Sequence, residues 1–368
     1  MDTVIYNYNY CRMPNVSAKE FNTHMNPLRF SLISYFNKIW TNGTVLHYYF
    51  YDKDSDGRNI ITNNGTKWVT WTTNEEEKNI VREAFAKWKD IGIGLNFKEV
   101  ETREDAEIRI GFMNDDGAWS YIGTDIVNPA VMPGKDDRTM NFGWSLLNKE
   151  GIDTAMHEIG HTLGFSHEHQ NPNSGIKWDK EAVYNALAQA PNYWPKDMVD
   201  HNILNKLPKD ELRGSDWDPN SIMHYPFGPG LIISPHKYQK GLVPEPGLSK
   251  HDIEWVKKLY PPITDNDLEL LLPSVTSKLE LNNGEQKSYI IKPAETKKYN
   301  ISTFGTSDGV IVLYEKNNND PIYITADNDN GEDYNANLNV KLYKNKEYLL
   351  RVRISYSKSP HETSIMYW

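Results

Sequence analysis

The segment from Met156 to His169, with the sequence MHEIGHTLGFSHEH, holds four histidines and two glutamates within thirteen residues. His157 and His161 are four positions apart, so on a helix they project from one face, one turn above the other. Two imidazoles placed in this way can bind a single zinc ion. Glu158 lies one step around the helix, where its carboxylate can reach a metal-bound water without binding the metal. This spacing indicates a metal site with a base beside it.

A third ligand can come from the residues that follow this helix. Gly164 has no Cβ, so it lets the chain turn back and bring His167 to the same ion. Three neutral imidazoles leave one position open for water, and zinc can lower the pKa of that water to roughly 7. Glu158 would take a proton from the water and later pass it to the leaving amine. An open position beside a base distinguishes a catalytic zinc site from a closed structural one.

Two other interpretations of the segment have to be weighed. One is a histidine-rich helix packed in the core. The other is a structural zinc site that a fourth ligand such as His169 closes. A bare H-E-x-x-H pattern arises by chance, but the full H-E-x-x-H-x-x-G-x-x-H spacing is far rarer. The full spacing favours the catalytic site over both alternatives, and His169 is then a residue behind the ligands or on the surface.

The local sequence predicts the helix that this site needs. Asp153 is placed to cap it, and Gly164 is placed to end it just after Leu163. Ala155, Ile159 and Leu163 give the helix an apolar stripe. We therefore expect one buried face and one face that carries the two histidines.

The surrounding sequence predicts a mixture of helices and short strands. A helix is expected at NEEEKNIVREAFAKWKD, with Asn74 as its cap and Glu77 completing a capping box. Ser249 is expected to cap a last helix that Pro261 and Pro262 end, and the 26–40 segment is expected to form a short helix. Strands are expected at TVLHYYFYD, GLNFKEV, AEIRIGF, WSYIG and RTMNFGW.

The last hundred residues have a different character. Short alternating segments follow one another with turn residues between them, as is typical of a β-sandwich. These segments are QKSYIIKP, KKYNIST, GVIVLYEK, DPIYITA, ANLNVKLY, KEYLLRVRI and ETSIMYW.

A second motif lies downstream of the histidines. The stretch DPNSIMHYPF contains Met223 and Tyr225. Three spaced histidines followed by a methionine turn are the metzincin pattern. HEIGHTLGFSHEH together with SIMHY resembles the astacin family closely, over roughly residues 40 to 262. The resemblance implies an α+β metzincin domain with a twisted mixed sheet.

The resemblance also implies roles for particular residues. It makes Glu158 the general base, and it makes His157, His161 and His167 the zinc ligands. It places Met223 as a hydrophobic floor beneath the metal. Tyr225 resembles the family's tyrosine, which binds zinc or swings to stabilise the oxyanion. Without the family, both residues would be read as ordinary core side chains.

The resemblance and the local sequence together predict how the chain divides into domains, and the chain departs from the family in some places. We expect an N-terminal extension over 1–40, a zinc peptidase domain over 41–262, a linker over 263–269 and a β-sandwich accessory domain over 270–368. The sandwich loosely resembles bacterial pre-peptidase C-terminal domains. The paired cysteines of animal astacins are absent here. The family's mature N-terminus lies near the glutamate that matches Glu168, but the extension leaves that role unassigned.

An exposed strand would supply a place for a peptide to bind. WSYIG resembles the astacin edge strand, and a peptide can add to such a strand through backbone hydrogen bonds. The candidate residues are Trp119, Ser120, Tyr121, Ile122 and Gly123. An edge strand with no ligand is the alternative.

Cys11 is the one cysteine of the chain, so no disulfide can form within it. It is either a thiolate that fills the open zinc position until removed, or a small buried hydrophobe, and the second is the commoner case. Two acidic stretches, DKDSDGRNI from Asp52 and DNDNGED from Asp327, leave calcium possible, although polar turns explain them more simply.

Composition limits the partners. The net charge is −10 and no cluster of Lys or Arg dominates a segment, which disfavours nucleic acid. No apolar run is long enough to cross a membrane, and the N-terminus has no signal-peptide pattern. Family resemblance nevertheless implies a secreted protein, and we expect a monomer.

The sequence therefore predicts a zinc-dependent endopeptidase that acts on proteins or peptides. The main alternative is a catalytically inactive metzincin-fold binding or adhesin protein. The intact Glu158 and three histidines argue against it. A zinc hydrolase with a substrate other than a peptide is a third possibility.

Overall fold

The structure is a computed structural model of the 368-residue chain. It describes residues 8–14, 38–62, 65–127, 131, 134, 137–207, 216–263, 268–317, 321–328, 330–331, 335–356 and 362–368. The chain forms two compact units. The first comprises Met1–Lys19 with Leu46–Lys258, and the second comprises Glu20–Val45 with Leu259–Trp368. The helix predicted over 26–40 lies almost wholly outside the described residues, and the predicted domain boundaries remain predictions.

A five-stranded mixed sheet organises the first unit, with the strand order β4-β1-β5-β7-β6. β1 runs parallel to β5, β5 runs parallel to β7, and β6 is antiparallel to β7. The bounds are Val45–Phe50 for β1, Asn96–Glu99 for β4, Ile108–Gly111 for β5, Trp119–Ser120 for β6 and Met140–Asn141 for β7. The predicted α+β architecture is confirmed, although β6 and β7 are shorter than their sequence patterns suggested.

The hairpin of β2 (Gly57–Thr62) and β3 (Gly65–Thr70) was not predicted. Most of its side chains are exposed, so it lacks the alternation of apolar and polar residues that reveals a strand in sequence. Asp56 accepts a hydrogen bond from the Lys53 amide at 3.0 Å, so the acidic stretch ahead of β2 forms a polar turn.

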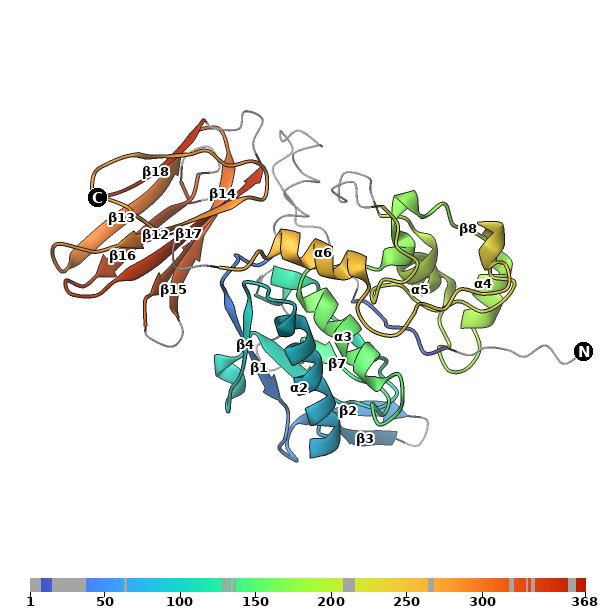
Figure 1. Cartoon of the computed structure of the whole chain (residues 1–368). Helices are drawn as coiled ribbons and strands as arrows, with labels where there is room; N and C mark the ends of the chain where they lie inside the picture. The colour runs from blue at the N-terminus through green and yellow to red at the C-terminus, as the bar shows by residue number, and fades with distance from the viewer. Residues whose placement is uncertain are drawn as a thin grey trace, which may run out of the picture. The chain divides into compact units, whose positions relative to one another are not determined.

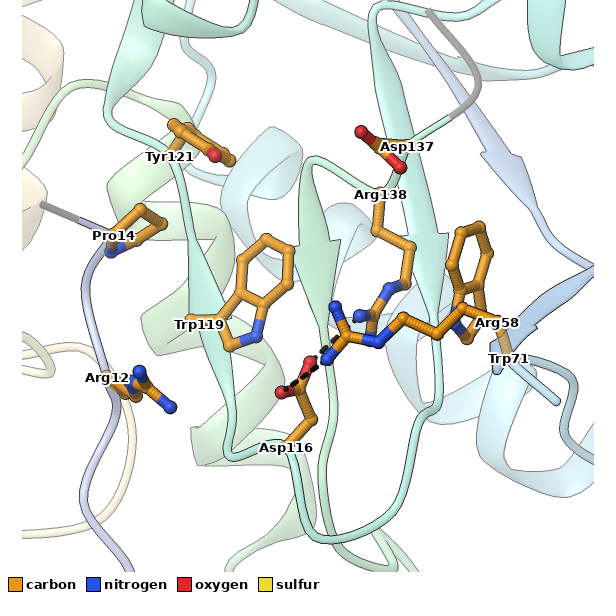
Figure 2. A pocket seen from close by; sticks show the side chains of 9 residues that line it. All are labelled: Arg12, Pro14, Arg58, Trp71, Asp116, Trp119, Tyr121, Asp137 and Arg138. Atoms are coloured by element: carbon orange, nitrogen blue, oxygen red, sulfur yellow. Dashed lines mark hydrogen bonds and ion pairs between the residues drawn. The ribbon is translucent and has the colours of Figure 1, made fainter. Parts of the chain in front are cut away.

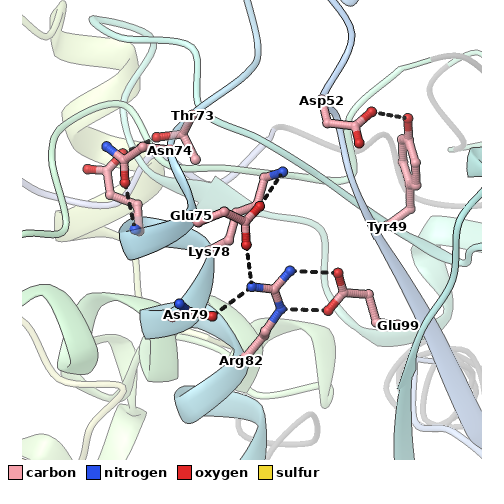
Figure 3. A network of polar contacts seen from close by, with 10 residues as sticks. Tyr49, Asp52, Thr73, Asn74, Glu75, Lys78, Asn79, Arg82 and Glu99 are labelled. Carbon is pink, nitrogen blue, oxygen red and sulfur yellow. Dashed lines mark hydrogen bonds and ion pairs between the residues drawn. The ribbon is translucent and has the colours of Figure 1, made fainter.

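Helix α2 (Glu75–Asp90) begins where the sequence predicted. The Asn74 side chain accepts the Glu77 amide at 3.0 Å, and Figure 3 shows this cap together with the ion pairs of Arg82 to Glu75 and Glu99. The reciprocal half of the capping box is not formed, because Glu77 is buried and accepts the Leu146 amide instead.

Helix α3 (Gly151–Thr162) packs against α2, and Figure 1 shows the two side by side. The predicted cap was wrong: Glu150 is the N-cap, and Asp153 lies inside the first turn, where its carboxylate accepts the Gly247 amide. The predicted end is confirmed. Gly164 has a φ of 97°, and its amide donates to the His161 carbonyl at 2.8 Å.

Short helices and strands make up the rest of the first unit, with several 3-10 turns between them. They are β8 (Lys177–Trp178), α4 (Lys180–Leu187), α5 (Lys196–Val199), a π-helical turn (Asp200–Leu204), β9 (Ile232–Ser234) and most of α6 (Lys250–Leu259). Ser249 caps α6 as predicted, since its hydroxyl accepts the Asp252 amide at 2.9 Å while its own amide donates to that carboxylate.

Two sheets form the β-sandwich of the second unit, as predicted (Figure 1). One sheet has the order β10-β12-β17-β14-β15 and the other β11-β18-β13-β16, and both contribute to one apolar core. Two short strands, β10 (Glu269–Leu270) and β11 (Ser277–Leu279), were not predicted. The other seven are β12 (Gln286–Ile291), β13 (Lys297–Phe304), β14 (Asp308–Glu315), β15 (Ile322–Asp327), β16 (Asn337–Leu342), β17 (Tyr348–Tyr356) and β18 (Thr363–Tyr367).

Residues just ahead of β1 belong to this second unit. The Trp40 carbonyl accepts the buried Arg353 guanidinium at 2.9 Å, and the Asn42 amide donates to Gln286 at 2.8 Å. Gly43 has a φ of 90°, and a Cβ there would overlap the Arg351 guanidinium. The positive φ favours glycine at this position.

Two further expectations concern membrane-spanning helices and the acidic stretch at Asp327. Among the described residues, no helix is long and apolar enough to cross a membrane. The Asp327 carboxylate accepts the amides of Asn330 and Asn337, so its described surroundings are those of a polar turn.

Candidate metal centre

Four donor side chains meet in the interior of the first unit. His157 and His161 project from α3, His167 follows the Gly164 turn, and Cys11 comes from the N-terminal segment 8–14. Their ligand atoms all lie within 4.8 Å of one another, and all four side chains are buried. The structure thus brings the three predicted histidines together.

The donor set fits a zinc ion. The Nδ1 atom of His157 lies 2.8 Å from the Ile222 carbonyl, and that of His161 lies 2.7 Å from the Phe165 carbonyl. These contacts hold the rings so that their Nε2 atoms face the cluster, and Nε2 of His157 is buried there with no hydrogen-bond partner. Burial lowers the pKa of His157 to about 4 and that of His161 well below its usual value. Neutral imidazoles of this kind are the form that binds a metal.

The methionine turn lies against α3. Met223 is buried, and a Cβ at Gly160 would overlap its sulfur, so glycine allows this close approach in the middle of α3. Asp252 fixes the turn by accepting the Ser221 hydroxyl at 2.6 Å and the Ile222 amide at 2.8 Å. Because the Ile222 carbonyl in turn orients His157, α6 positions this candidate ligand through a chain of contacts.

Glu158 points into the same buried space. Its side chain is 1% exposed, its Oε2 lies 3.5 Å from the Cys11 sulfur, and its Oε1 has no hydrogen-bond partner. Burial raises the pKa of Glu158 to about 8. A buried carboxyl group beside three histidines is a candidate for proton transfer.

Tyr225 closes the other side of the cluster. Its hydroxyl donates to the Cys11 carbonyl at 2.6 Å and lies 2.6 Å from Nε2 of His167. Burial raises its pKa well above the usual value, so the phenol keeps its proton. The phenol is thus a buried donor beside the ligands.

The two residues left without a role have structural partners. His169 is fully buried, its Nε2 lies 2.9 Å from the Asn202 carbonyl, and its donor atoms are not part of the cluster. The fourth donor near the histidines is therefore Cys11. Glu168 accepts the Asp218 amide at 3.0 Å and the Asn171 side chain at 2.9 Å.

The predicted edge segment lies beside the site only in part. β6 contains Trp119 and Ser120, whereas Tyr121 and Ile122 follow the strand and Gly123 begins a 3-10 turn. Ser120 faces α3, with its hydroxyl 3.1 Å from that of Thr162.

The contacts that hold the N-terminal segment were missed by the sequence analysis. The Arg12 amide donates to the Ala118 carbonyl at 2.8 Å, just before β6. The amides of Tyr10 and Met13 donate to the side chains of Asn192 and Asn202. These partners lie about 180 positions along the chain, in segments with no motif, so no local signal could have revealed them.

Comparison with known proteins identifies the family. The family model described as "Astacin", a peptidase family, matches residues 67–260. The chain belongs to the astacin family. The resemblance drawn from the two motifs is thereby confirmed.

Similar proteins support this placement. Human Tolloid-like protein 1 is 31% identical over 156 residues, covering 39% of this chain and 13% of that protein. Karilysin from Tannerella forsythia is 32% identical over 151 residues, covering 37% of this chain and 28% of that protein. The structure of myroilysin matches with a TM-score of 0.50 and 28% identity, covering 62% of this chain and 97% of myroilysin. The chain thus spans under a third of these two sequence relatives.

Proposed function

We propose that this astacin-family chain is a zinc-dependent endopeptidase. The observation that carries the proposal is the buried cluster of His157, His161 and His167 with Glu158 beside it. A bound zinc ion would supply Lewis-acid chemistry at this place. The substrate would be a protein or a peptide that lies along β6, with Trp119 and Ser120 as its backbone partners.

The roles of the chain's own residues follow from their positions. Glu158 takes a proton from the attacking water and then delivers it to the leaving amine. Tyr225 offers its phenol proton to the oxygen that becomes negative as the peptide carbonyl is attacked. Met223 and Gly160 keep the helix and the turn in close contact, which holds His157 in place.

We further propose that the structure represents a latent form, in which Cys11 occupies the fourth position. The Cys11 sulfur lies 3.6 Å from Nε2 of His161 and 3.5 Å from Glu158. It stands where the water would have to bind, and the Tyr225 hydroxyl is engaged by the Cys11 carbonyl. Burial raises the pKa of the free thiol, but a thiol that binds zinc loses its proton. Removal of segment 8–14 would free both the fourth position and the Tyr225 hydroxyl.

We also propose, from the family, that the protein works outside the cell and acts as a monomer. The described contacts of Asp56 and Asp327 are those of polar turns, so they do not favour a calcium site.

Metal removal tests the proposed function. The purified protein should contain one zinc per chain by elemental analysis. Once segment 8–14 has been removed, its cleavage of casein should be lost after dialysis against a chelator and regained with added zinc. An inactive binding protein would hold zinc but leave casein intact both before and after removal of segment 8–14. A protein without zinc would contradict the metal centre itself.

A further inference from the structure

One sheet of the β-sandwich carries positive charge on its outer face. Its strands β11, β18, β13 and β16 turn alternate side chains to the apolar core, so the residues between these point outward (Figure 1). The outward-facing residues of these four strands, all of which the structure describes, include no Asp or Glu. They include three exposed lysines, which are Lys278, Lys298 and Lys341. The chain as a whole has a net charge of −10, so this outer face is an exception.

These three lysines have no ion pair with any carboxylate that the structure describes. Cations elsewhere in the chain do have one. At the ends of β12 and β14 in the other sheet, Lys292 and Lys316 lie 2.5 Å and 3.7 Å from the Glu347 carboxylate. Figure 2 shows a similar arrangement in the first unit, where two arginines share the Asp116 carboxylate. The outer face thus offers positive charge that no described side chain balances.

Two of the lysines lie directly opposite each other. Lys298 of β13 pairs with Lys341 of β16 in the antiparallel ladder, and both side chains are exposed. Like charges at opposite positions destabilise a sheet. A negatively charged group that binds between the two ammonium groups removes this repulsion. The pair therefore favours an anionic ligand, independently of the absence of carboxylates.

A row of amide and hydroxyl groups continues from this pair. The Asn339 amide donates to the Asn300 side-chain oxygen at 2.7 Å, and the Ser302 hydroxyl donates to that of Asn337 at 2.6 Å. Both pairs point outward, because alternate residues of a strand share a face with Lys298. An amide group has two donors and an oxygen acceptor, so each asparagine keeps capacity for a further hydrogen bond. Such a row suits a ligand that is rich in hydroxyl groups.

Two exposed aromatic rings lie on the same face. Phe304 is 43% exposed and Trp368 is 38% exposed, and their ring centroids are 6.0 Å apart. Trp368 lies opposite Asn300, with two backbone hydrogen bonds of 3.0 Å between them, so its side chain also points outward. The negative face of an aromatic ring attracts the C–H groups on one side of a sugar ring. The rings therefore add an apolar surface that fits a carbohydrate.

We propose that this outer face of the sandwich binds an acidic polysaccharide. Lys298 and Lys341 pair with its carboxylate or sulfate groups, and Trp368 packs on one of its sugar rings. The third lysine, Lys278, lies at the Phe304 end of the face, about 20 Å along the strands from the pair. Charges this far apart suit a polymer that repeats its charge better than a single small anion. Three lysines are few for nucleic acid, whose binding uses many phosphate contacts. The proposal is independent of the peptidase chemistry.

Binding to immobilised polysaccharides tests the proposal. Dissociation constants of the full-length chain are measured on polygalacturonate, heparin and neutral dextran, at low and at high salt. We expect binding to at least one of the two acidic polymers, weakening with salt, and no binding to dextran. Lys298→Gln together with Lys341→Gln should raise the dissociation constant about tenfold, as for the loss of two exposed ion pairs. Trp368→Ala should also weaken the binding.

A matched double variant separates this face from net charge. Lys292→Gln together with Lys316→Gln makes the same change in charge on the other sheet, and it should alter the dissociation constant by less than about twofold. The Lys298 and Lys341 double variant should melt at the wild-type temperature or above, because it removes a like-charge pair. Weaker binding is then not a result of unfolding.

Four results would overturn the proposal. They are no binding to either acidic polymer, equal weakening by the two double variants, binding to dextran as tight as to the acidic polymers, and binding to polyglutamate as tight as to polygalacturonate. The last result would show that the face recognises an acidic protein instead.

Discussion

At the scale of single residues, Cys11 contacts the two side chains to which we assign the proposed chemistry, Glu158 and Tyr225. Glu158 and Tyr225 each face the space that the reacting water and carbonyl would share. In the described structure both side chains contact residue Cys11 instead. One cysteine therefore lies among the three histidines and contacts both Glu158 and Tyr225.

Cys11→Ala tests this restraint. The substitution removes the sulfur that competes with water for the fourth position. The full-length variant should therefore cleave casein at least about tenfold faster than the untreated wild type, because the loss of one group at a metal site changes binding or activity by about that factor. Zinc content should stay near one per chain, because the three histidines remain. Equal activity of the two unprocessed chains would show that Cys11 does not block the site.

The spacing of residues made most of this site predictable. His157, Glu158, His161 and His167 lie within eleven positions, so helix geometry and one glycine turn were enough to bring them together. Cys11 is 146 positions from His157, and nothing in its own neighbourhood shows that it meets the histidines. A contact of that range depends on the path of the whole chain.

At the scale of elements, α6 supports the site from a distance. Asp252 is buried and accepts hydrogen bonds from Ser221, Ile222 and Ser249, so it ties the helix start to the methionine turn. The sequence predicted the helix and its Ser249 cap from local signals. It did not predict that Asp252 also reaches Ser221 and Ile222, because those partners are 30 and 31 positions away.

Asp252→Ala should destabilise the first unit. Three donors would lose their buried acceptor, and the expected cost is about 2–4 kcal/mol in the free energy of unfolding. Urea unfolding followed by tryptophan fluorescence measures this cost. Glu254→Ala, an exposed carboxylate on the same helix, is the control and should change stability by less than about 0.5 kcal/mol. If both variants unfold alike, Asp252 does not hold the turn.

At the scale of the whole molecule, the described residues ahead of β1 are part of the C-terminal unit. Trp40 is 6% exposed, its amide donates to the Tyr260 hydroxyl, and its carbonyl accepts Arg353. The alternating strands of the sandwich were visible in the sequence because each has one buried face. The docking of 38–44 was not, because no local signal in these few residues indicates a partner in the sandwich.

Trp40→Ala should weaken the second unit and leave the metal centre intact. Truncation of a buried tryptophan costs about 3–5 kcal/mol. Trp368→Ala, at an exposed tryptophan of the same unit (38% exposed), should cost less than about 1 kcal/mol. Thermal unfolding measures both, with zinc content as the check on the first unit. Equal melting temperatures for the two variants would show that 38–44 does not stabilise the sandwich.

The proposed site assigns zinc binding to the three histidines and proton transfer to Glu158. Zinc content and casein cleavage test this assignment most directly. Both are measured on the wild type, Glu158→Ala and His161→Ala, each after removal of segment 8–14. We expect Glu158→Ala to keep about one zinc per chain and lose at least about a hundredfold in rate, which is the lower range for a general base. His161→Ala should lose the zinc together with the activity. Wild-type turnover by Glu158→Ala, or a full zinc content in His161→Ala, would contradict the proposed site.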